Sequence, residues 1–402
     1  MEKNWVKMSD VLFFQEGPGV RNTQYTTSGV KLLNVANLVD GKVDLSTSTR
    51  YISEDEAYGK YKHFLCDAGD FVVASSGIKV EYIDKKMGFI EESMLPLCMN
   101  TSTIRFKVIN GDKLRIKYFM YYLKSQHFKE QLAKEITGSA QLNYGPSHLK
   151  KMVLPLIDVS AQDEIIRCLD NIQKNIDMRR KELICFDELI RARFVELFGD
   201  PIKNPKGWEV VKLSECLERI DNGKSFTCDS NAREGVFPAI LKLSAATYGD
   251  YRPYENKALL DEKQFVESVE VHRGDLLFTR KNTPDLVGMA AYVFETPEKL
   301  MMPDLIFRLV TNERMTPTFL WQLINNREFR PAIQGISGGS AKSMSNISKE
   351  RLKNIEVICP PISEQKKLEG VLEQVDKSKD SVQKALDEAQ LLFDSLMQQY
   401  FG

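Results

Sequence analysis

The sequence lacks any apolar run approaching the ~20 residues that cross a bilayer, and its longest runs, such as residues 153–159, contain Pro or Asp. Its start, Met-Glu-Lys-Asn-Trp, leads into no signal-peptide core. No two of its seven cysteines are separated by only two residues, which excludes a zinc knuckle and a CxxC redox pair. We therefore expect a cytoplasmic protein with no membrane partner and with reduced, buried thiols.

An excess of charge of one sign is also missing. The 55 Lys and Arg residues face 56 Asp and Glu residues, for a net charge of −1. A nucleic-acid-binding domain is typically strongly basic, so the overall charge alone argues against a nucleic-acid partner.

Recognisable catalytic and metal-binding motifs are absent as well. The four histidines form no ligand cluster, and Asn204-Pro205-Lys206 lacks the second Pro and the aromatic residue of an amino-methyltransferase motif. Asn222-Gly223-Lys224-Ser225 lacks the earlier glycine of a phosphate-binding loop, because Glu218 stands there. We expect no catalytic residue, no metal site and no cofactor on this chain.

What the sequence does contain is an internal repeat. Gly69-Asp70 returns as Gly274-Asp275, and Leu149-Lys150 returns as Leu352-Lys353. Further matching pairs keep the same order, at offsets between 201 and 205 residues. Because chance does not supply six matches in register, the 402 residues are two copies of one unit.

Each copy has a mixed part followed by a long helix. Short runs of β-branched and aromatic residues predict buried strands at 70–74, 103–108, 275–279 and 305–310. A helical stretch follows in each copy, at 117–135 and at 317–334. The sequence thus predicts an α+β (mixed α/β) fold with globular modules at 1–151 and 206–355, a central helix with its linker at 152–205, and a C-terminal helix at 356–402.

The two long helices are predicted from heptads. Apolar residues recur every seven positions over 160–198 and 363–401, which is typical of an a/d coiled-coil seam. Arg179 and Arg193 interrupt one seam and Lys379 the other, and we expect the two arginines to pair with acidic residues. We predict antiparallel pairing of the helices, although each stripe could instead pack on its own module. The predicted pairing residues are Leu169, Ile176, Leu183, Ile190, Leu197, Leu372, Val375, Val382, Leu386 and Phe393.

The module boundary carries a resemblance to a known family. The run from Phe198-Gly199-Asp200-Pro201 to Asn204-Pro205-Lys206-Gly207-Trp208 is similar to the boundary in a Type I restriction–modification DNA specificity subunit. Cys359-Pro360-Pro361-Ile362-Ser363-Glu364-Gln365 resembles the start of its heptad helix. The resemblance covers the whole chain, although residues 154–162 have one Pro and no Glu before Gln162.

The resemblance implies a non-catalytic subunit that acts in phage defence. Each target-recognition domain would read one half of a bipartite, asymmetric site on double-stranded DNA, and the helices would set the unread spacer. The partners would be methyltransferase subunits, two in number, and translocase/endonuclease subunits, which would bind S-adenosylmethionine, ATP and Mg. The alternative is a repeat scaffold that binds protein or carbohydrate through its two modules.

Candidate DNA-binding residues are polar and cationic side chains in loops that follow the two Gly-Asp sequences or belong to a second repeated sequence, Gly138-Ser139-Ala140 and Gly339-Ser340-Ala341. Arg and Lys suit guanine edges, whereas Asn and Gln suit adenine. Among them Arg280 is the strongest candidate. The set is Ser75, Ser76, Lys79, Ser139, Gln141, Asn143 and Tyr144 in the first module, and Thr279, Arg280, Lys281, Asn282, Lys342, Ser343 and Asn346 in the second.

Charge is divided unevenly between the parts. The modules at 1–151 and 206–355 carry net charges of +4 and +1, and the segments at 152–205 and 356–402 carry −2 and −4. The modules are therefore the mildly positive portion of the chain. This modest charge predicts that partner subunits supply much of the grip on DNA phosphates.

Overall fold

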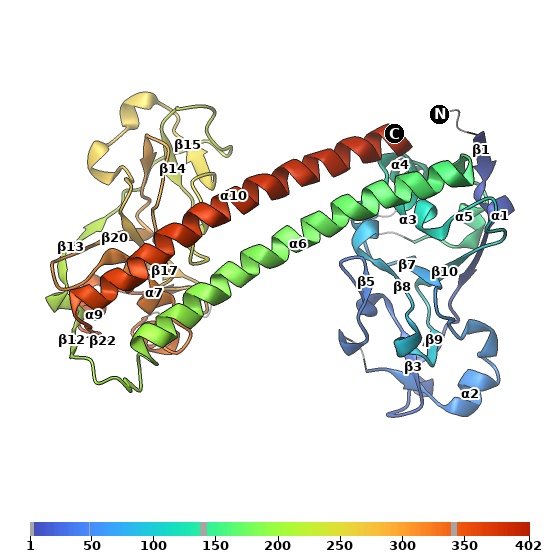
Figure 1. The fold of residues 1–402 in the computed structure, drawn as a ribbon, viewed down its shortest axis with the longest axis horizontal. Helices are drawn as coiled ribbons and strands as arrows, with labels where there is room; N and C mark the ends of the chain where they lie inside the picture. Colours follow the sequence, from blue (N-terminus) through green and yellow to red (C-terminus); the bar gives the residue numbers. More distant parts are fainter. Residues whose placement is uncertain (1–3, 48, 137–142, 339–343) are drawn as a thin grey trace. The chain divides into compact units, whose positions relative to one another are not determined.

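The computed structural model describes residues 4–47, 49–136, 143–338 and 344–402. It divides the chain into two compact units: residues 1–178 with 386–402, and residues 179–385. Each unit contains one globular module and a part of each long helix (Figure 1).

Among the described residues, the first module has a larger four-stranded sheet, a smaller three-stranded sheet and two separate strand pairs. Its strands are β1 (Asn4–Lys7), β2 (Leu12–Glu16), β3 (Val30–Leu33), β4 (Leu38–Val39), β5 (Lys42–Val43), β6 (Tyr51–Ile52), β7 (Phe71–Ala74), β8 (Met87–Phe89), β9 (Leu97–Met99), β10 (Thr103–Val108) and β11 (Val153–Leu156). The larger sheet has the order β2-β10-β7-β8 and is antiparallel throughout. In the smaller one, β3 pairs with β6 antiparallel and with β9 parallel. Strand β1 pairs with β11, which ties the start of the module to the approach to the long helix.

The first module has the helices α1 (Met8–Val11), α2 (Glu54–Tyr58), α3 (Ile116–Lys124), α4 (Gln126–Glu135) and α5 (Pro146–Leu149). Helix α3 packs on the larger sheet, whereas Ala57 of α2 belongs to the core beside the smaller sheet. Phe119 of α3 packs against Phe106 of β10, with the ring centroids 5.0 Å apart. The single helical stretch expected at 117–135 is two helices, because the Ser125 hydroxyl accepts a hydrogen bond from the Phe128 amide and caps α4.

The second module repeats this topology. Its strands are β12 (Val210–Lys212), β13 (Leu217–Asn222), β14 (Ala239–Leu241), β15 (Asn256–Ala258), β16 (Leu276–Thr279), β17 (Lys281–Asn282), β18 (Ala290–Tyr292), β19 (Leu300–Met301), β20 (Ile306–Thr311), β21 (Ser345–Asn346) and β22 (Glu356–Ile358). The larger sheet has the order β13-β20-β16-β18 and the smaller one β15-β14-β19. The helices are α7 (Pro317–Asn325), α8 (Arg330–Gly335) and α9 (Lys349–Lys353), so the expected stretch at 317–334 is also divided. The matching strand orders confirm the repeat.

An ion pair occupies the same place in both modules, buried in the first and largely buried in the second. Arg105 of β10 lies 3.2 Å from Asp70, and Arg308 of β20 lies 3.0 Å from Asp275. These carboxylates belong to the two Gly-Asp sequences that reveal the repeat. Arg105 also donates to the backbone carbonyl of Leu65, so the pair holds a neighbouring loop against the larger sheet.

The long helices are α6 (Val159–Phe198) and α10 (Ile362–Phe401), close to the predicted ranges. Each is joined to its module by a fully buried glutamine in the first turn. The Gln162 side chain accepts from the Arg115 amide and donates to the Lys113 carbonyl. Gln365 repeats this arrangement with the Thr316 amide and the Arg314 carbonyl. The linker begins at Gly199, where φ is +78° and the amide bonds to the Val195 carbonyl, which ends α6.

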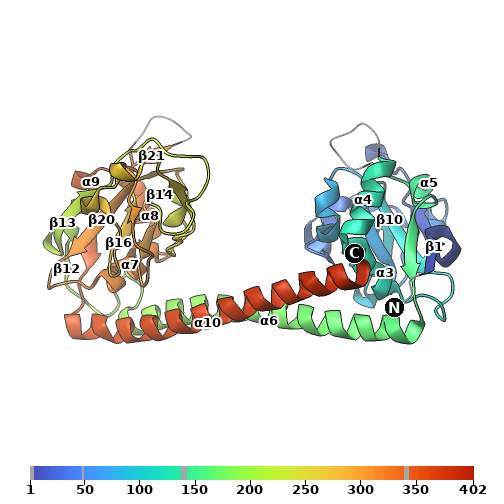
Figure 2. The same ribbon diagram turned by 90° about the horizontal axis from the view of Figure 1, so that it is seen from above.

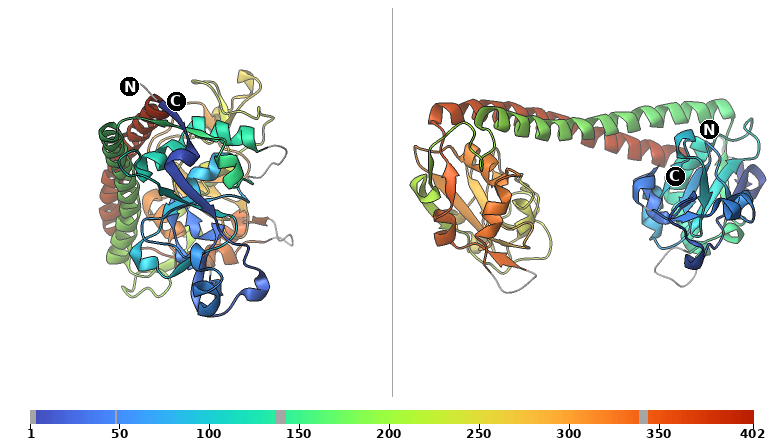
Figure 3. Two further views of the ribbon diagram at one scale, coloured as in Figure 1. Left: turned by 90° about the vertical axis from the view of Figure 1, so that its right-hand side faces the viewer. Right: turned by 90° about the horizontal axis from the view of Figure 1, so that it is seen from below.

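The helices pair antiparallel, as predicted. In the first unit Tyr400 of α10 lies beside Cys168 of α6, and in the second Lys379 of α10 forms an ion pair with Asp187 of α6. The first half of each helix therefore accompanies the second half of the other, and the segments run in opposite directions within each unit (Figures 2 and 3).

The predicted seam is largely buried, but it does not serve helix pairing alone. Leu368 and Leu372 of α10 belong to one core with Phe194 of α6 and with Phe319 of α7. In the second unit the apolar stripes therefore serve both purposes: they pair the helices and they pack on the module. Among the predicted pairing residues, Leu183 and Leu197 are half-buried, and the remaining eight are buried.

The polar interruptions of the first seam meet acidic partners, as expected. Arg179 pairs with Glu182 at 3.0 Å, and Arg193 pairs with Glu196 at 2.7 Å. Each partner lies one turn further along α6.

The seven cysteines are free thiols, but they are not all buried as we had expected. Cys66, Cys98, Cys216 and Cys359 are buried, whereas Cys185 is exposed on α6. In the part of the chain that the structure describes, no helix is long and apolar enough to cross a membrane.

Candidate nucleic-acid interface

The two loops singled out in each module come together in the structure. In the first module Ser76, after β7, forms a β-bridge with Asn143, and the Tyr144 amide bonds to the Ser75 carbonyl at 3.0 Å. In the second module β17 pairs with β21 and aligns Lys281 with Asn346. We call these two places the first and the second loop junction.

The first loop junction is rich in hydroxyl and carboxylate groups. The Ser76 hydroxyl donates to the Ser102 hydroxyl at 2.6 Å, and the Ser75 hydroxyl lies 3.5 Å from a carboxylate oxygen of Glu16. Asn143 is exposed beside them. These groups combine hydrogen-bond donors with strong acceptors.

The second loop junction is cationic. The Arg280 guanidinium lies 4.9 Å from the centroid of the Phe307 ring, and its Nε and Nη2 are each 3.4 Å from Oδ1 of Asn346. Lys349 Nζ lies 5.5 Å from the same ring and donates to the Ile220 carbonyl. Lys281 is exposed next to Arg280.

Four of the sequence candidates are buried, and we withdraw them as residues that contact bases. Ser75 is 1% exposed, Tyr144 2%, Thr279 0% and Asn282 7%. A buried side chain cannot reach a base edge unless its neighbours move. Thr279 and Asn282 instead bond within the module, since the Asn282 amide donates to the Thr247 hydroxyl at 3.2 Å.

Tyr144 is unusual among the buried residues. Among the described residues its hydroxyl oxygen has no hydrogen-bond partner. Burial, together with the charge of Glu16, raises its pKa, so the hydroxyl remains protonated at neutral pH. Tyr144 is therefore a neutral, buried group of the first loop junction.

The remaining candidates divide into two groups. Those at or near the surface are Ser76, Lys79, Asn143, Arg280, Lys281 and Asn346. Ser139, Gln141, Lys342 and Ser343 lie outside the described residues.

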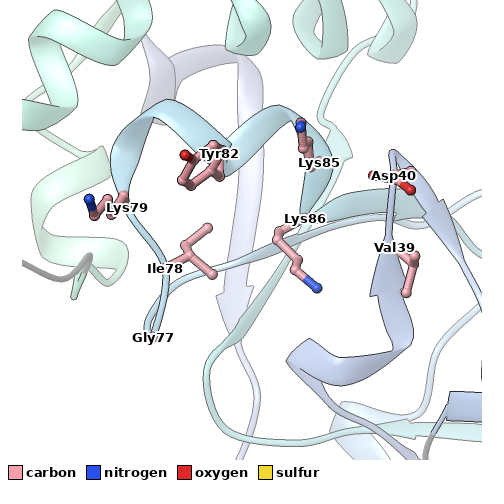
Figure 4. A pocket seen from close by; sticks show the side chains of 8 residues that line it. All are labelled: Val39, Asp40, Gly77, Ile78, Lys79, Tyr82, Lys85 and Lys86. Carbon is pink, nitrogen blue, oxygen red and sulfur yellow. The ribbon is translucent and has the colours of Figure 1, made fainter. Parts of the chain in front are cut away.

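A lysine-lined cavity of about 450 Å³ adjoins the first loop junction (Figure 4). The turn between β4 and β5 forms one wall with Val39 and Asp40, and the segment 77–86 forms the rest. Figure 4 shows Lys79 and Tyr82 on this segment, together with Lys85 and Lys86, which the sequence analysis missed. The adjacent Lys85-Lys86 pair near an aromatic residue is the signal that could have revealed it.

The apolar residues on the surfaces of the long helices form a second feature that the heptad pattern does not predict. Met178, Ile184, Leu189 and Val195 of α6 are each at least 50% exposed, as are Leu391 and Leu392 of α10. Leu189 and Leu392 occupy equivalent positions in the two copies, 203 residues apart.

Known proteins resemble this chain over much of its length. The Escherichia coli Type I restriction enzyme EcoEI specificity subunit is 27% identical over 251 residues, or 60% of this chain and 42% of that protein. A putative Type I restriction enzyme MjaX specificity subunit of Methanocaldococcus jannaschii is 25% identical over 391 residues, covering 89% of this chain and 84% of that protein. The matches with EcoEI and with the MjaVIII subunit of the same archaeon span less than half the length of those two relatives.

A solved structure supports the fold. The S subunit of a Type I restriction–modification system from M. genitalium superposes with a TM-score of 0.59 at 14% identity, covering 100% of this chain and 96% of that one. The model of the Type I restriction modification DNA specificity domain matches residues 21–184 and again residues 205–390. The chain therefore belongs to the Type I restriction modification DNA specificity domain family, and it carries two copies of that domain.

Proposed function

We propose that this chain is the DNA sequence-specificity subunit of a Type I restriction–modification complex. Each module reads one half of a bipartite site on double-stranded DNA. The observation that carries the proposal is the pair of loop junctions, which share a backbone arrangement but present different side chains. Two copies of one scaffold with unlike contact groups suit an asymmetric sequence.

Charge and surface features support a shared grip on DNA. The modules have net charges of only +4 and +1, so they provide a weak attraction for phosphates. Ionic contacts from other subunits would strengthen binding, and the exposed apolar residues of α6 and α10 offer docking positions for them. We propose two methyltransferase subunits and translocase/endonuclease subunits as partners, with S-adenosylmethionine, ATP and Mg bound there.

The chain itself carries no catalytic group in this proposal. Among the described residues, no cluster of three or more His, Cys, Asp or Glu side chains is placed to hold a metal ion. Its role is to present DNA to a methyltransferase, and the long helices set the length of the unread spacer.

The test is a domain exchange in the assembled complex. Residues 206–355 are replaced by the corresponding module of a relative, and the methylated motif is determined by methylome sequencing. We expect one half-site to change while the other is retained. The reciprocal exchange of residues 1–151 is the matched control and should change the other half only. An unchanged motif in either exchange would show that the replaced module does not determine specificity.

A further inference from the structure

Arg280 is held at the second loop junction through its backbone. Its amide donates to the Leu305 carbonyl at 3.0 Å, and its carbonyl accepts from the Ile347 amide at 2.8 Å. The residue is thus fixed to the segment before β20 and to the segment after β21. Because both attachments are backbone hydrogen bonds, the starting point of the side chain is well defined.

The guanidinium is positioned but not neutralised. It stacks on Phe307, which is 2% exposed, and contacts Oδ1 of Asn346 at the long distance of 3.4 Å. Among the described residues it has no carboxylate within ion-pair distance, in contrast to Arg308, which pairs with Asp275. A half-buried cation without a counter-charge is ready to bind an external acceptor.

The free donors form a two-pronged edge. A guanidinium has five N–H donors, and only Nε and Nη2 face Asn346. Within the described part of the chain, Nη1 and the second hydrogen of Nη2 bond to no acceptor, and they lie side by side. This fork matches the O6 and N7 acceptors that guanine presents in the major groove.

A DNA phosphate is the other ligand that fits such a fork, and the repeat argues against it. Phosphate contacts position a protein without reading sequence, so both modules would benefit from the same cation. The two junctions share an asparagine, Asn143 and Asn346, at equivalent positions. At the position of Arg280, however, the first module has the buried Ser75. A group present in only one module is typical of base readout.

We infer that Arg280 reads a guanine in the half-site of the second module, with Phe307 and Asn346 as positioning residues. This inference rests on the proposed function and adds the base to it. The first module uses different contact groups at its junction and does not require a guanine at the matching position.

The experiment compares Arg280→Ala, Arg280→Lys and wild type in the complex with the methyltransferase subunits. Dissociation constants and methylation rates are measured on duplexes in which each base pair of the half-site is replaced in turn. Wild type should prefer G·C at one position by on the order of tenfold or more. Arg280→Ala should abolish that preference and leave the other positions unchanged. Arg280→Lys keeps the charge but loses the fork, and it should retain only part of the preference.

Arg327→Ala is the matched control, because Arg327 is an exposed arginine of the same module. It should keep the preference. Thermal melting of each variant shows whether the module is intact.

Two outcomes would overturn the inference. One is a half-site without a G·C pair. The other is an equal loss of affinity by Arg280→Ala on all duplexes with a shallower salt dependence, which identifies a phosphate contact. If wild type shows no sequence preference at any position, the proposed function fails, and that result is distinct from both.

Discussion

The glutamines at the starts of the long helices show how one side chain joins two elements. Gln365 is fully buried and satisfies the Thr316 amide, the Arg314 carbonyl and the Pro360 carbonyl together. Without it, the Thr316 amide and the Pro360 carbonyl would lose this partner while buried, which costs about 1–3 kcal/mol for each group. Gln162 makes equivalent hydrogen bonds in the first module, which explains why a Gln occupies this position in both copies.

We therefore predict that Gln365→Ala lowers the free energy of unfolding of the second module by about 2–4 kcal/mol. Urea denaturation followed by tryptophan fluorescence measures it, since Trp208 and Trp321 belong to or adjoin this core. Gln374→Ala, at an exposed position of α10, is the control and should change stability by less than about 0.5 kcal/mol. Equal effects of the two substitutions would contradict the role of Gln365.

A second residue makes the stability of α10 depend on pH. Desolvation, followed by the charge of Asp380, raises the pKa of Asp376 to about 6, while Lys379 and Arg273 oppose the shift and Glu295 adds to it. The folded state thus binds a proton more tightly than the unfolded state, whose carboxyl titrates near 3.9. Stability from this group is fully present below pH 4 and is lost as the pH rises through 6.

Asp376→Asn should remove that loss. We expect the variant to be more stable than wild type by about 1 kcal/mol at pH 7.5, a figure reduced for the partial exposure of the carboxyl. The gain should disappear near pH 4. Unfolding curves at both pH values check it, and an equal gain at the two would mean that the charge is not responsible.

At the scale of elements, the heptads placed the long helices to within a residue of their observed starts. They succeeded because apolar residues that recur every seven positions over five heptads fit a long helix and few other structures. The strands at 103–108 and 71–74 were also evident from their β-branched and aromatic residues. The break between α3 and α4 was not, because a single Ser125 cap decided it against an otherwise helical pattern.

The candidate site was harder to predict than the fold. The sequence indicated two loops in each module, which the structure brings together, but not that Ser75, Tyr144, Thr279 and Asn282 would be buried. Burial depends on which side of a loop faces the sheet, and a short polar segment carries no periodicity from which to read it. The cavity beside Lys85 and Lys86 was missed because its other wall comes from the distant β4–β5 turn.

The buried apolar stripe of α10 leads to a prediction about stability. Leu372 is 1% exposed within the core of the second module, whereas Leu391 of the same helix is 72% exposed. Leu372→Ala should lower the free energy of unfolding by about 2–5 kcal/mol, because it leaves a cavity. Leu391→Ala is the matched control and should fall within about 0.5 kcal/mol of wild type. Similar values for the two would contradict the assignment of the seam.

At the scale of the whole molecule, the equivalent exposed leucines lead to a prediction about assembly. If the proposed partners dock here, Leu189→Glu combined with Leu392→Glu should weaken binding of methyltransferase subunits at least about tenfold, since charges replace apolar side chains at both proposed docking positions. Binding is measured by titration calorimetry, and melting temperatures should stay near wild type. Gln374→Glu is the control and should bind normally. Unaltered binding by the double variant would exclude these leucines from the interface.

The proposed role of the helices is tested by lengthening both. One heptad inserted after Met178 in α6 and another before Leu386 in α10 keeps the seam in phase and adds about 10 Å, or roughly three base pairs. The methylated motif should keep both half-sites and gain a longer spacer. A heptad in α6 alone should disrupt pairing. A functional double insertion with the original spacer would contradict the role.

The first unit consists of two separate segments of the chain, and this affects how it folds during synthesis. Phe401 lies against Tyr118 and Tyr122 of α3, and residues 386–402 belong to the same unit as residues 1–178. The first module therefore emerges from the ribosome long before the segment that covers these tyrosines is made. The second unit is continuous in sequence and can close as soon as it has emerged. The module that is made first is completed last, and in that interval the faces of Tyr118 and Tyr122 that Phe401 covers are left without this partner.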